Sequence, residues 1–246
     1  MSLVISDLHG NNLKLQTFIQ YKPEEEHIVL GDFFDSFHAS DEDIASTFKL
    51  AMDNNVTVTV GNHDVVYLQN AHSYFRCSGN RTNHMFVHLM ETYKDRFAMS
   101  LIRDNFLLSH GGLSKKHGKP FDTVEEANDW INSEWDWYKN QPVVPETLSP
   151  LFDIGYIRGG SQEVSGVLWL TFGREKYDTR FSQVCGHTCS SDVRSMTHKN
   201  HVIHVCVDTP KFLCFNTSTR EFEDFMLDEY KSPDKEQMRK IIERQF

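Results

Sequence analysis

Several features are scarce in this chain of 246 residues, and each absence excludes a class of protein. No apolar run approaches the roughly 18 residues that a membrane-crossing helix requires, so we expect no membrane partner. Basic residues are fewer than acidic ones: 25 Lys and Arg stand against 35 Asp and Glu, which gives a net charge of −10. That balance argues against a surface that follows long nucleic acid over many phosphates. A small phosphorylated ligand stays open, because bound metal cations would reverse the local field.

Cysteine is also scarce, and its five copies make an odd number. Met1 leads directly into an apolar segment at 3–5, without the pattern of a secretory signal. We therefore expect a cytoplasmic protein with free thiols in a reducing compartment. Cys185 and Cys189 lack the second cysteine pair that a structural zinc site of this kind needs.

The chain has no internal repeat and no low-complexity segment, and short apolar runs alternate with amphipathic stretches, which is typical of an α/β protein. The pattern predicts strands at 3–5, 27–30, 56–60, 106–109, 167–170, 183–186, 202–207, 212–215 and 221–226. It predicts helices over 12–22, after N-caps at Ser40 and Asp122, and from Ser232 onwards. No linker divides the chain, so we interpret 1–246 as one domain with an insertion at about 66–103 beside the active face.

Side chains of the types that bind metals follow five of the strand-like runs. The five segments are Ser6-Asp7-Leu8-His9-Gly10-Asn11, Gly31-Asp32-Phe33-Phe34-Asp35, Gly61-Asn62-His63-Asp64, Ser109-His110-Gly111-Gly112 and Gly186-His187-Thr188. Loops at the C-terminal ends of strands in an α/β sheet share one rim, where ligands bind. We therefore expect the five segments to bring their side chains to one point.

The chemistry of these side chains predicts two divalent metal ions. Asp7 and His9 flank a single residue, so both can reach one ion, and the two oxygens of Asp32 can bridge two ions. Imidazole with carboxylate and amide oxygen suits Mn, Fe or Zn better than Ca, and we expect Mn. Two such ions polarise a phosphoryl group and produce a hydroxide nucleophile near neutral pH. A Ser or Cys nucleophile, for which the sequence has no signature, is then unnecessary.

Taken singly, each residue also has a purely structural interpretation. Asp7 and Asn11 are types that cap a helix. Asp32 and Asp35 are types that occur in turns, and His63 could be a packed histidine. The functional interpretation depends on all five segments occurring together.

Asp-x-His-Gly, Gly-Asp-x-x-Asp, Gly-Asn-His-Asp, His-Gly-Gly and Gly-His-Thr, in this order, resemble the calcineurin-like metallophosphoesterases. The His-Gly-Gly element is most similar to the phosphoprotein phosphatase branch, which includes serine/threonine phosphatases and bacterial diadenosine tetraphosphatases. The segments run from residue 7 to 187, and Val207-Asp208-Thr209 resembles a later family element. The resemblance implies a four-layer sandwich of two mixed β-sheets flanked by helices.

The resemblance also implies a role for each site residue. Six residues would bind the two metal ions: Asp7, His9, Asp32, Asn62, His110 and His187. Asp7 and His9 would hold the first ion, with Asp32 bridging to the second. His63 would be the general acid, and Asp35 would orient it. Asn62 is also expected to contact the substrate phosphate.

The chain departs from that branch at three points. The branch usually has Arg after the second Asp, where this chain has Ser36 and then Phe37, so one phosphate clamp is missing. Arg158 is our candidate replacement, with Arg174 as second choice. Cys189 stands where many metallophosphoesterases have a second His, and a thiolate there could bind a soft metal. Pro210 replaces the Gly of the late element.

The sequence therefore predicts a dinuclear metal-dependent hydrolase of phosphomonoesters, resembling serine/threonine phosphatases, that uses a metal-bound hydroxide. One alternative is the hydrolysis of dinucleoside polyphosphates, which are nucleotide anhydrides. Another is a non-catalytic module that holds metal and docks partners. The expected partners are a phosphorylated small molecule, a nucleotide or a phosphoprotein. Residues 72, 74, 75 and 76 are candidates for lining the substrate pocket.

Overall fold

The computed structural model describes residues 1–246 except 37, 72–74, 76–82 and 227–246. The predicted final helix from Ser232 lies outside the described residues, as do Phe37 and three of the candidate pocket residues. Phe75 is described, and it is buried against Tyr138 and Phe152. Its side chain therefore belongs to the core rather than to a pocket wall.

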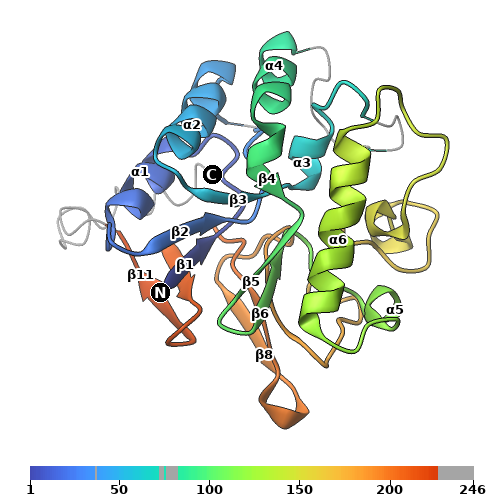
Figure 1. Ribbon diagram of the computed structural model, residues 1–246. Helices are drawn as coiled ribbons and strands as arrows, with labels where there is room; N and C mark the ends of the chain where they lie inside the picture. The colour runs from blue at the N-terminus through green and yellow to red at the C-terminus, as the bar shows by residue number, and fades with distance from the viewer. Residues whose placement is uncertain (37, 72–74, 76–82, 227–246) are drawn as a thin grey trace.

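The first sheet has the strand order β11-β10-β1-β2-β3-β4 (Figure 1). Its strands are β1 (Ser2–Ile5), β2 (Glu26–Val29), β3 (Thr57–Thr59), β4 (Phe97–Ala98), β10 (Leu213–Asn216) and β11 (Glu221–Asp224). β1 to β4 are parallel, whereas β10 and β11 pair antiparallel. Because the parallel strands all end at one edge, the loops that follow them open on the same rim.

The second sheet has the order β5-β6-β7-β9-β8. Its strands are β5 (Ser100–Arg103), β6 (Phe106–Ser109), β7 (Ser182–Cys185), β8 (Arg194–Thr197) and β9 (Ile203–Cys206). β6, β7 and β9 are parallel, and the edge strands β5 and β8 run antiparallel to them. Both sheets are therefore mixed.

The two sheets pack face to face through an apolar layer that excludes water. Its side chains include Val4, Ile28 and Phe215 from the first sheet and Phe106, Leu108, Val184 and Val205 from the second. Helices α1 (Asn12–Gln20) and α2 (Asp41–Asp53) pack against the first sheet, and α6 (Val124–Lys139) packs against β5 of the second (Figure 1). The order helix, sheet, sheet, helix confirms the predicted four-layer sandwich.

Local signals in the sequence set where the longer helices begin. At α2 the Ser40 hydroxyl accepts from Asp43 N at 3.1 Å, and the Asp43 carboxylate accepts from Ser40 N at 3.3 Å. This reciprocal cap confirms the predicted start. The prediction of Asp122 as the cap of α6 is wrong by one residue, since Thr123 Oγ1 accepts from Glu126 N at 3.2 Å.

Two further stretches differ from the predictions. The segment 167–170 is a turn rather than a strand, because its backbone bonds locally, with Trp169 N donating to Gly166 O at 3.0 Å. Its apolar side chains are buried, which produced the strand-like pattern. Within 66–103, α4 (His84–Tyr93) is followed by β4 and β5, so residues from 97 onwards belong to the two sheets. Among the described residues, the other helices are α3 (Asn62–Val65), α5 (Lys115–Gly118) and short 3-10 helices at Lys94–Arg96, Pro150–Phe152, Tyr156–Arg158 and Lys199–His201.

No helix in the described part of the chain combines the length and the apolar character that crossing a bilayer requires. The four cysteines within the described residues, at 185, 189, 206 and 214, are free thiols.

Candidate metal centre

Five loops at the strand ends meet at one rim of the sandwich. They follow β1, β2 and β3 of the first sheet and β6 and β7 of the second. Backbone hydrogen bonds join them: Asp7 N donates to Gly31 O at 3.1 Å, and His9 N donates to Asp32 O at 2.9 Å. Within the second sheet, Gly186 N donates to His110 O at 2.7 Å. Between the sheets, His187 N donates to Asp7 Oδ2 at 3.0 Å. These hydrogen bonds therefore hold the loops in fixed positions relative to one another.

The structure gathers carboxylate and imidazole groups into two sets that share Asp32. One set is Asp7, His9 and Asp32, and the other is Asp32, His110 and His187; within each, the ligand atoms lie within 4.8 Å of one another. His9 Nε2 lies 3.8 Å from Asp32 Oδ2, and His110 Nε2 lies 3.3 Å from the same oxygen. Asn62 Oδ1 adds an amide oxygen at 2.8 Å from His110 Nε2. All six predicted ligands are thus brought together.

The imidazoles are oriented so that one nitrogen faces the shared carboxylate. His110 Nδ1 donates to Leu30 O at 2.7 Å, and His9 Nδ1 lies 2.7 Å from Asp35 O. Such backbone partners fix the ring and leave Nε2 as the ligand atom. His187 Nε2 is buried and has no hydrogen-bond partner among the described residues. A buried polar atom without a partner is costly, and a metal ion would satisfy it, so the residues present fit a divalent metal pair.

The backbone of the site is strained in the way that functional loops often are. Five of the predicted site residues have left-handed φ angles: Asp7 at 53°, His9 at 46°, Asp32 at 58°, Asp35 at 60° and His187 at 64°. Such conformations cost non-glycine residues on the order of 1 kcal/mol or more each. The hydrogen bonds between the loops hold these side chains toward the rim despite that cost.

Charge interactions within the site shift the pKa of its imidazoles in opposite directions. Burial acts to lower the pKa of His110, but the charge of Asp32 and its hydrogen bond, together with Asp7 and Leu30 O, raise the pKa to about 10. Burial lowers the pKa of His187 well below its ordinary value, and the neighbouring His110 and Arg158 add to this. Since a metal requires a neutral imidazole, protons and metal compete for His110, whereas His187 is already in the ligand form.

A hydrogen-bonded chain of three residues lies beside the donor sets. His63 Nδ1 donates to Asp35 Oδ2 at 2.7 Å, and the Tyr67 hydroxyl donates to Asp35 Oδ1. Burial acts to lower the pKa of His63, but Asp32 and Asp35 raise it to about 8. His63 N also donates to Asp32 Oδ1 at 2.9 Å, which ties this chain to the shared carboxylate.

Sequence reasoning missed Tyr67, although its spacing of four residues after His63 places it about one helical turn away. It also gave no role to Asp64, whose fully buried carboxylate accepts from Asp32 N at 2.8 Å, Phe33 N at 2.9 Å and Gly61 N at 2.9 Å. Asp64 therefore joins the loop that follows β2 to the loop that follows β3. The sequence feature that could have identified Asp64 is its position within the Gly-Asn-His-Asp segment.

The two candidate phosphate clamps, Arg158 and Arg174, lie in different surroundings. Arg158 Nη2 donates to His187 O at 3.1 Å and its Nε donates to Thr171 Oγ1 at 2.9 Å, so its guanidinium lies against the loop of the second donor set. Arg174 is exposed, and its backbone N donates to Thr171 O at 3.2 Å. Ser36 Oγ accepts from Ala39 N at 3.0 Å and shapes the turn before α2.

Cys189 belongs to neither donor set. Burial, together with the nearby Asp208 and Asp7 carboxyls, raises the pKa of its thiol to about 12. Lys14, which is fully buried, donates from Nζ to Thr209 O at 2.7 Å and so anchors the late element beneath the site.

The Asp, His and Asn side chains clustered at this rim are donors of the kind that two divalent metal ions use in phosphoester hydrolysis. Residues 2–191 match the family model of the calcineurin-like phosphoesterases. The chain belongs to this family, whose members are generally metal-dependent hydrolases.

Individual relatives are distant. A serine/threonine-protein phosphatase of Caenorhabditis elegans is 25% identical over 146 residues, which cover 56% of this chain and 32% of the relative. The chain thus spans about a third of that relative's length. The crystal structure of a cold-active protein-tyrosine phosphatase of a Shewanella species has a TM-score of 0.50 at 17% identity, over 84% of this chain and 70% of that one. A protein serine/threonine phosphatase from Saccharomyces cerevisiae has a TM-score of 0.46 at 16% identity, over 85% and 66%.

Proposed function

We propose that the chain hydrolyses phosphomonoesters with two divalent metal ions, manganese foremost, and with His63 as general acid. The observation that carries this proposal is the juxtaposition of the His63–Asp35–Tyr67 chain with two donor sets sharing Asp32. A module that merely held metal for structure would have no use for an oriented imidazole at its edge.

Asp7 and His9 would hold the first ion, and His110, His187 and Asn62 the second, with Asp32 common to both. When bound, the pair would polarise a phosphoryl group and lower the pKa of water. Asn62 Oδ1 lies 2.8 Å from His110 Nε2, and the Asn62 amide would also contact a phosphate oxygen.

His63 supplies the proton for the leaving oxygen. Asp35 accepts from Nδ1, so the opposite nitrogen Nε2 is the one that can deliver a proton. Tyr67 donates to the other Asp35 oxygen and fixes the carboxylate in that orientation. Arg158, held against the His187 loop, is the proposed replacement for the phosphate clamp that Ser36 cannot provide.

The first experiment measures Mn²⁺-dependent hydrolysis of an alkyl phosphate such as phosphoserine and of p-nitrophenyl phosphate. An alkoxide needs protonation to leave and nitrophenolate does not, so His63→Ala should lower kcat about 10²–10⁴-fold on the alkyl ester and far less on the aryl ester. His88→Ala, at an exposed position on α4, is the matched control.

Three outcomes separate the alternatives. Equal losses on both esters would argue against His63 as the acid. Turnover of diadenosine tetraphosphate without turnover of either monoester would favour the nucleotide anhydride hydrolase. Bound Mn²⁺ without turnover of any of these substrates would favour the non-catalytic module.

A further inference from the structure

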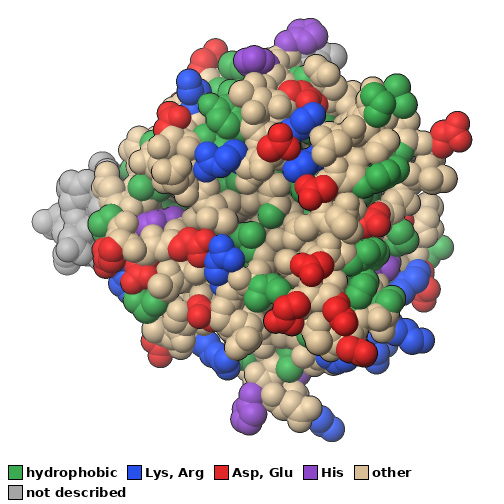
Figure 2. All heavy atoms as spheres, viewed as in Figure 1, with side chains coloured by type: hydrophobic (Ala, Val, Ile, Leu, Met, Phe, Trp, Pro, Cys, Tyr) green, Lys and Arg blue, Asp and Glu red, His purple; other side chains and the backbone are tan. Residues whose placement is uncertain are grey.

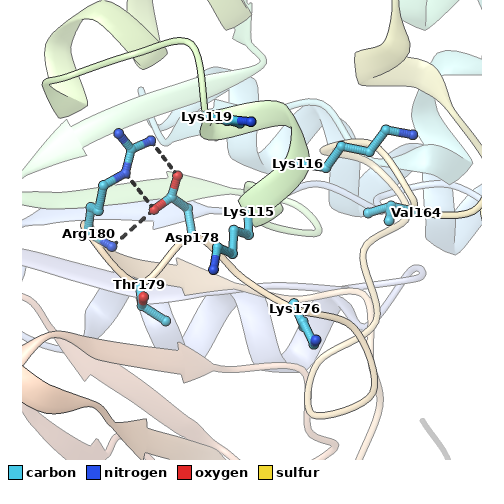
Figure 3. Close-up of a pocket in the computed structure, with 8 residues that line it drawn as sticks. All are labelled: Lys115, Lys116, Lys119, Val164, Lys176, Asp178, Thr179 and Arg180. Atoms are coloured by element: carbon cyan, nitrogen blue, oxygen red, sulfur yellow. Dashed lines mark hydrogen bonds and ion pairs between the residues drawn. The ribbon is translucent and has the colours of Figure 1, made fainter.

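A cavity of about 620 Å³ beside α5 concentrates positive charge on a chain whose net charge is −10. Figure 3 shows its lining, in which five of the eight side chains are cationic. The lining residues are Lys115, Lys116, Lys119, Val164, Lys176, Asp178, Thr179 and Arg180. None of them belongs to the metal donor sets or to the His63 chain.

The cations lie on two segments, 115–119 and 176–180, which are joined by hydrogen bonds. Lys115 N donates to Lys176 O at 2.9 Å, and Asp178 N donates to Leu113 O at 3.0 Å. The buried Gln183 amide donates to Leu113 O at 3.1 Å and to Asp178 O at 3.0 Å, which bridges the segments. The lysine side chains therefore project from a fixed backbone frame.

The one carboxylate in the lining is already neutralised. Asp178 is buried, and its two oxygens accept from Arg180 Nε at 3.0 Å and from Arg180 Nη2 at 2.7 Å. The four lysines of the cavity form no ion pair with any carboxylate in the described part of the chain. The lysine ion pairs found there are formed by Lys22, Lys94, Lys139 and Lys211.

Figure 2 shows Lys and Arg side chains at the lower right margin of the molecule, where α5 lies in Figure 1. Several like charges around a concavity focus the field and raise the local concentration of anions. Ammonium groups are compact charges suited to phosphate oxygens, and the Thr179 hydroxyl adds a further donor.

We propose that this cavity is a binding site for a small polyanion of the class of multiply phosphorylated small molecules. Its volume lies within the roughly 300–1,000 Å³ typical of small-molecule sites. The cations line one cavity on an otherwise acidic chain, whereas nucleic acid is recognised by an extended basic surface. The site is independent of the proposed hydrolysis.

The test is calorimetric titration with inorganic tripolyphosphate at low and at physiological salt. The double variant Lys115→Glu/Lys176→Glu should weaken binding by at least about tenfold. Lys49→Glu/Lys199→Glu changes the net charge equally at exposed positions outside the cavity and should stay within about twofold of the parent. Asp32→Asn should also retain binding, because it alters only the metal centre.

The proposal is overturned if tripolyphosphate fails to bind or binds the Lys115→Glu/Lys176→Glu variant as well as the parent. It is equally overturned if a poly-glutamate peptide binds the cavity while tripolyphosphate does not, since the partner would then be an acidic protein segment. Phosphoserine hydrolysis by the Lys115→Glu/Lys176→Glu variant should equal that of the parent. Failure of this proposal is thus distinguishable from failure of the proposed function.

Discussion

Asp32 is the residue on which both metal donor sets depend. Its carboxylate faces His9 at 3.8 Å and His110 at 3.3 Å, and it also accepts from His63 N. A glycine is required opposite it, because a Cβ at Gly61 would overlap the carboxylate. The electrostatics agree with this central position: burial acts to raise the pKa of Asp32, yet His110 and His63 lower it well below its ordinary range.

Tyr67 is a positioning residue in this account, acting on His63 through Asp35. Tyr67→Phe removes one hydrogen bond to the Asp35 carboxylate, worth about 1.5–3 kcal/mol when one partner is charged. We expect about a tenfold loss of kcat on phosphoserine, a smaller loss on p-nitrophenyl phosphate, and little change in KM. The matched control is Tyr93→Phe, since Tyr93 packs by its ring against Phe48. A loss confined to KM would contradict the positioning role.

The sequence indicates the proposed metal ligands but not the groups that support them. Asp7, His9 and His187 can be identified because their types recur after strands in a recognisable order. Asp64 and Tyr67 act through contacts with residues some 30 positions earlier, at Asp32 and Asp35, which no local pattern reveals. Their roles require the loops to be placed in three dimensions.

At the scale of elements, an ion pair joins the two sheets away from the metal centre. Arg103, on β5, donates from Nε and Nη2 to the two carboxylate oxygens of Glu26, on β2, both at 2.7 Å. Hydrogen bonding from Arg103, opposed by burial and aided by Ser2, lowers the pKa of Glu26 to about 2. A two-point contact of this kind fixes geometry as well as adding energy.

Glu26→Gln should therefore destabilise the protein in a pH-dependent way. Because the folded pKa of Glu26 lies below the unfolded one, its contribution is present above about pH 4.5 and is lost as the pH falls toward about 2. Both side chains are about a third exposed, so we expect about 1 kcal/mol at neutral pH. Urea unfolding of Glu26→Gln and of the exposed control Glu24→Gln measures it. A loss that persists unchanged at about pH 2 would contradict this account.

Element prediction succeeded where the apolar period was clear and failed where it was not. The strands β1, β6 and β7 coincide with buried apolar runs of the sequence. The capping box at Ser40 determines where α2 begins. β4 has only two residues, too short for alternation to be visible. The segment 167–170 has the apolar character of a strand, but its side chains are buried from a turn that also accepts from Gly111 N through Val167 O at 2.7 Å.

At the scale of the whole molecule, the sandwich places two chemically opposite sites on one chain. The rim where the parallel strands end gathers carboxylates and imidazoles for cations, and the cavity beside α5 gathers lysines for anions. Both depend on the second sheet, since β6 leads into His110 and, a few residues later, into Lys115. The acidic net charge is therefore not uniform over the molecule.

The central claim is that one carboxylate organises a two-ion centre, and calorimetric titration of the metal-stripped protein with Mn²⁺ tests it most directly. We predict two bound ions per chain, loss of at least one in Asp32→Asn, and unchanged binding in Glu42→Gln, an exposed control on α2. Binding of a single ion by the parent, or two ions by Asp32→Asn with unaltered affinity, would contradict it.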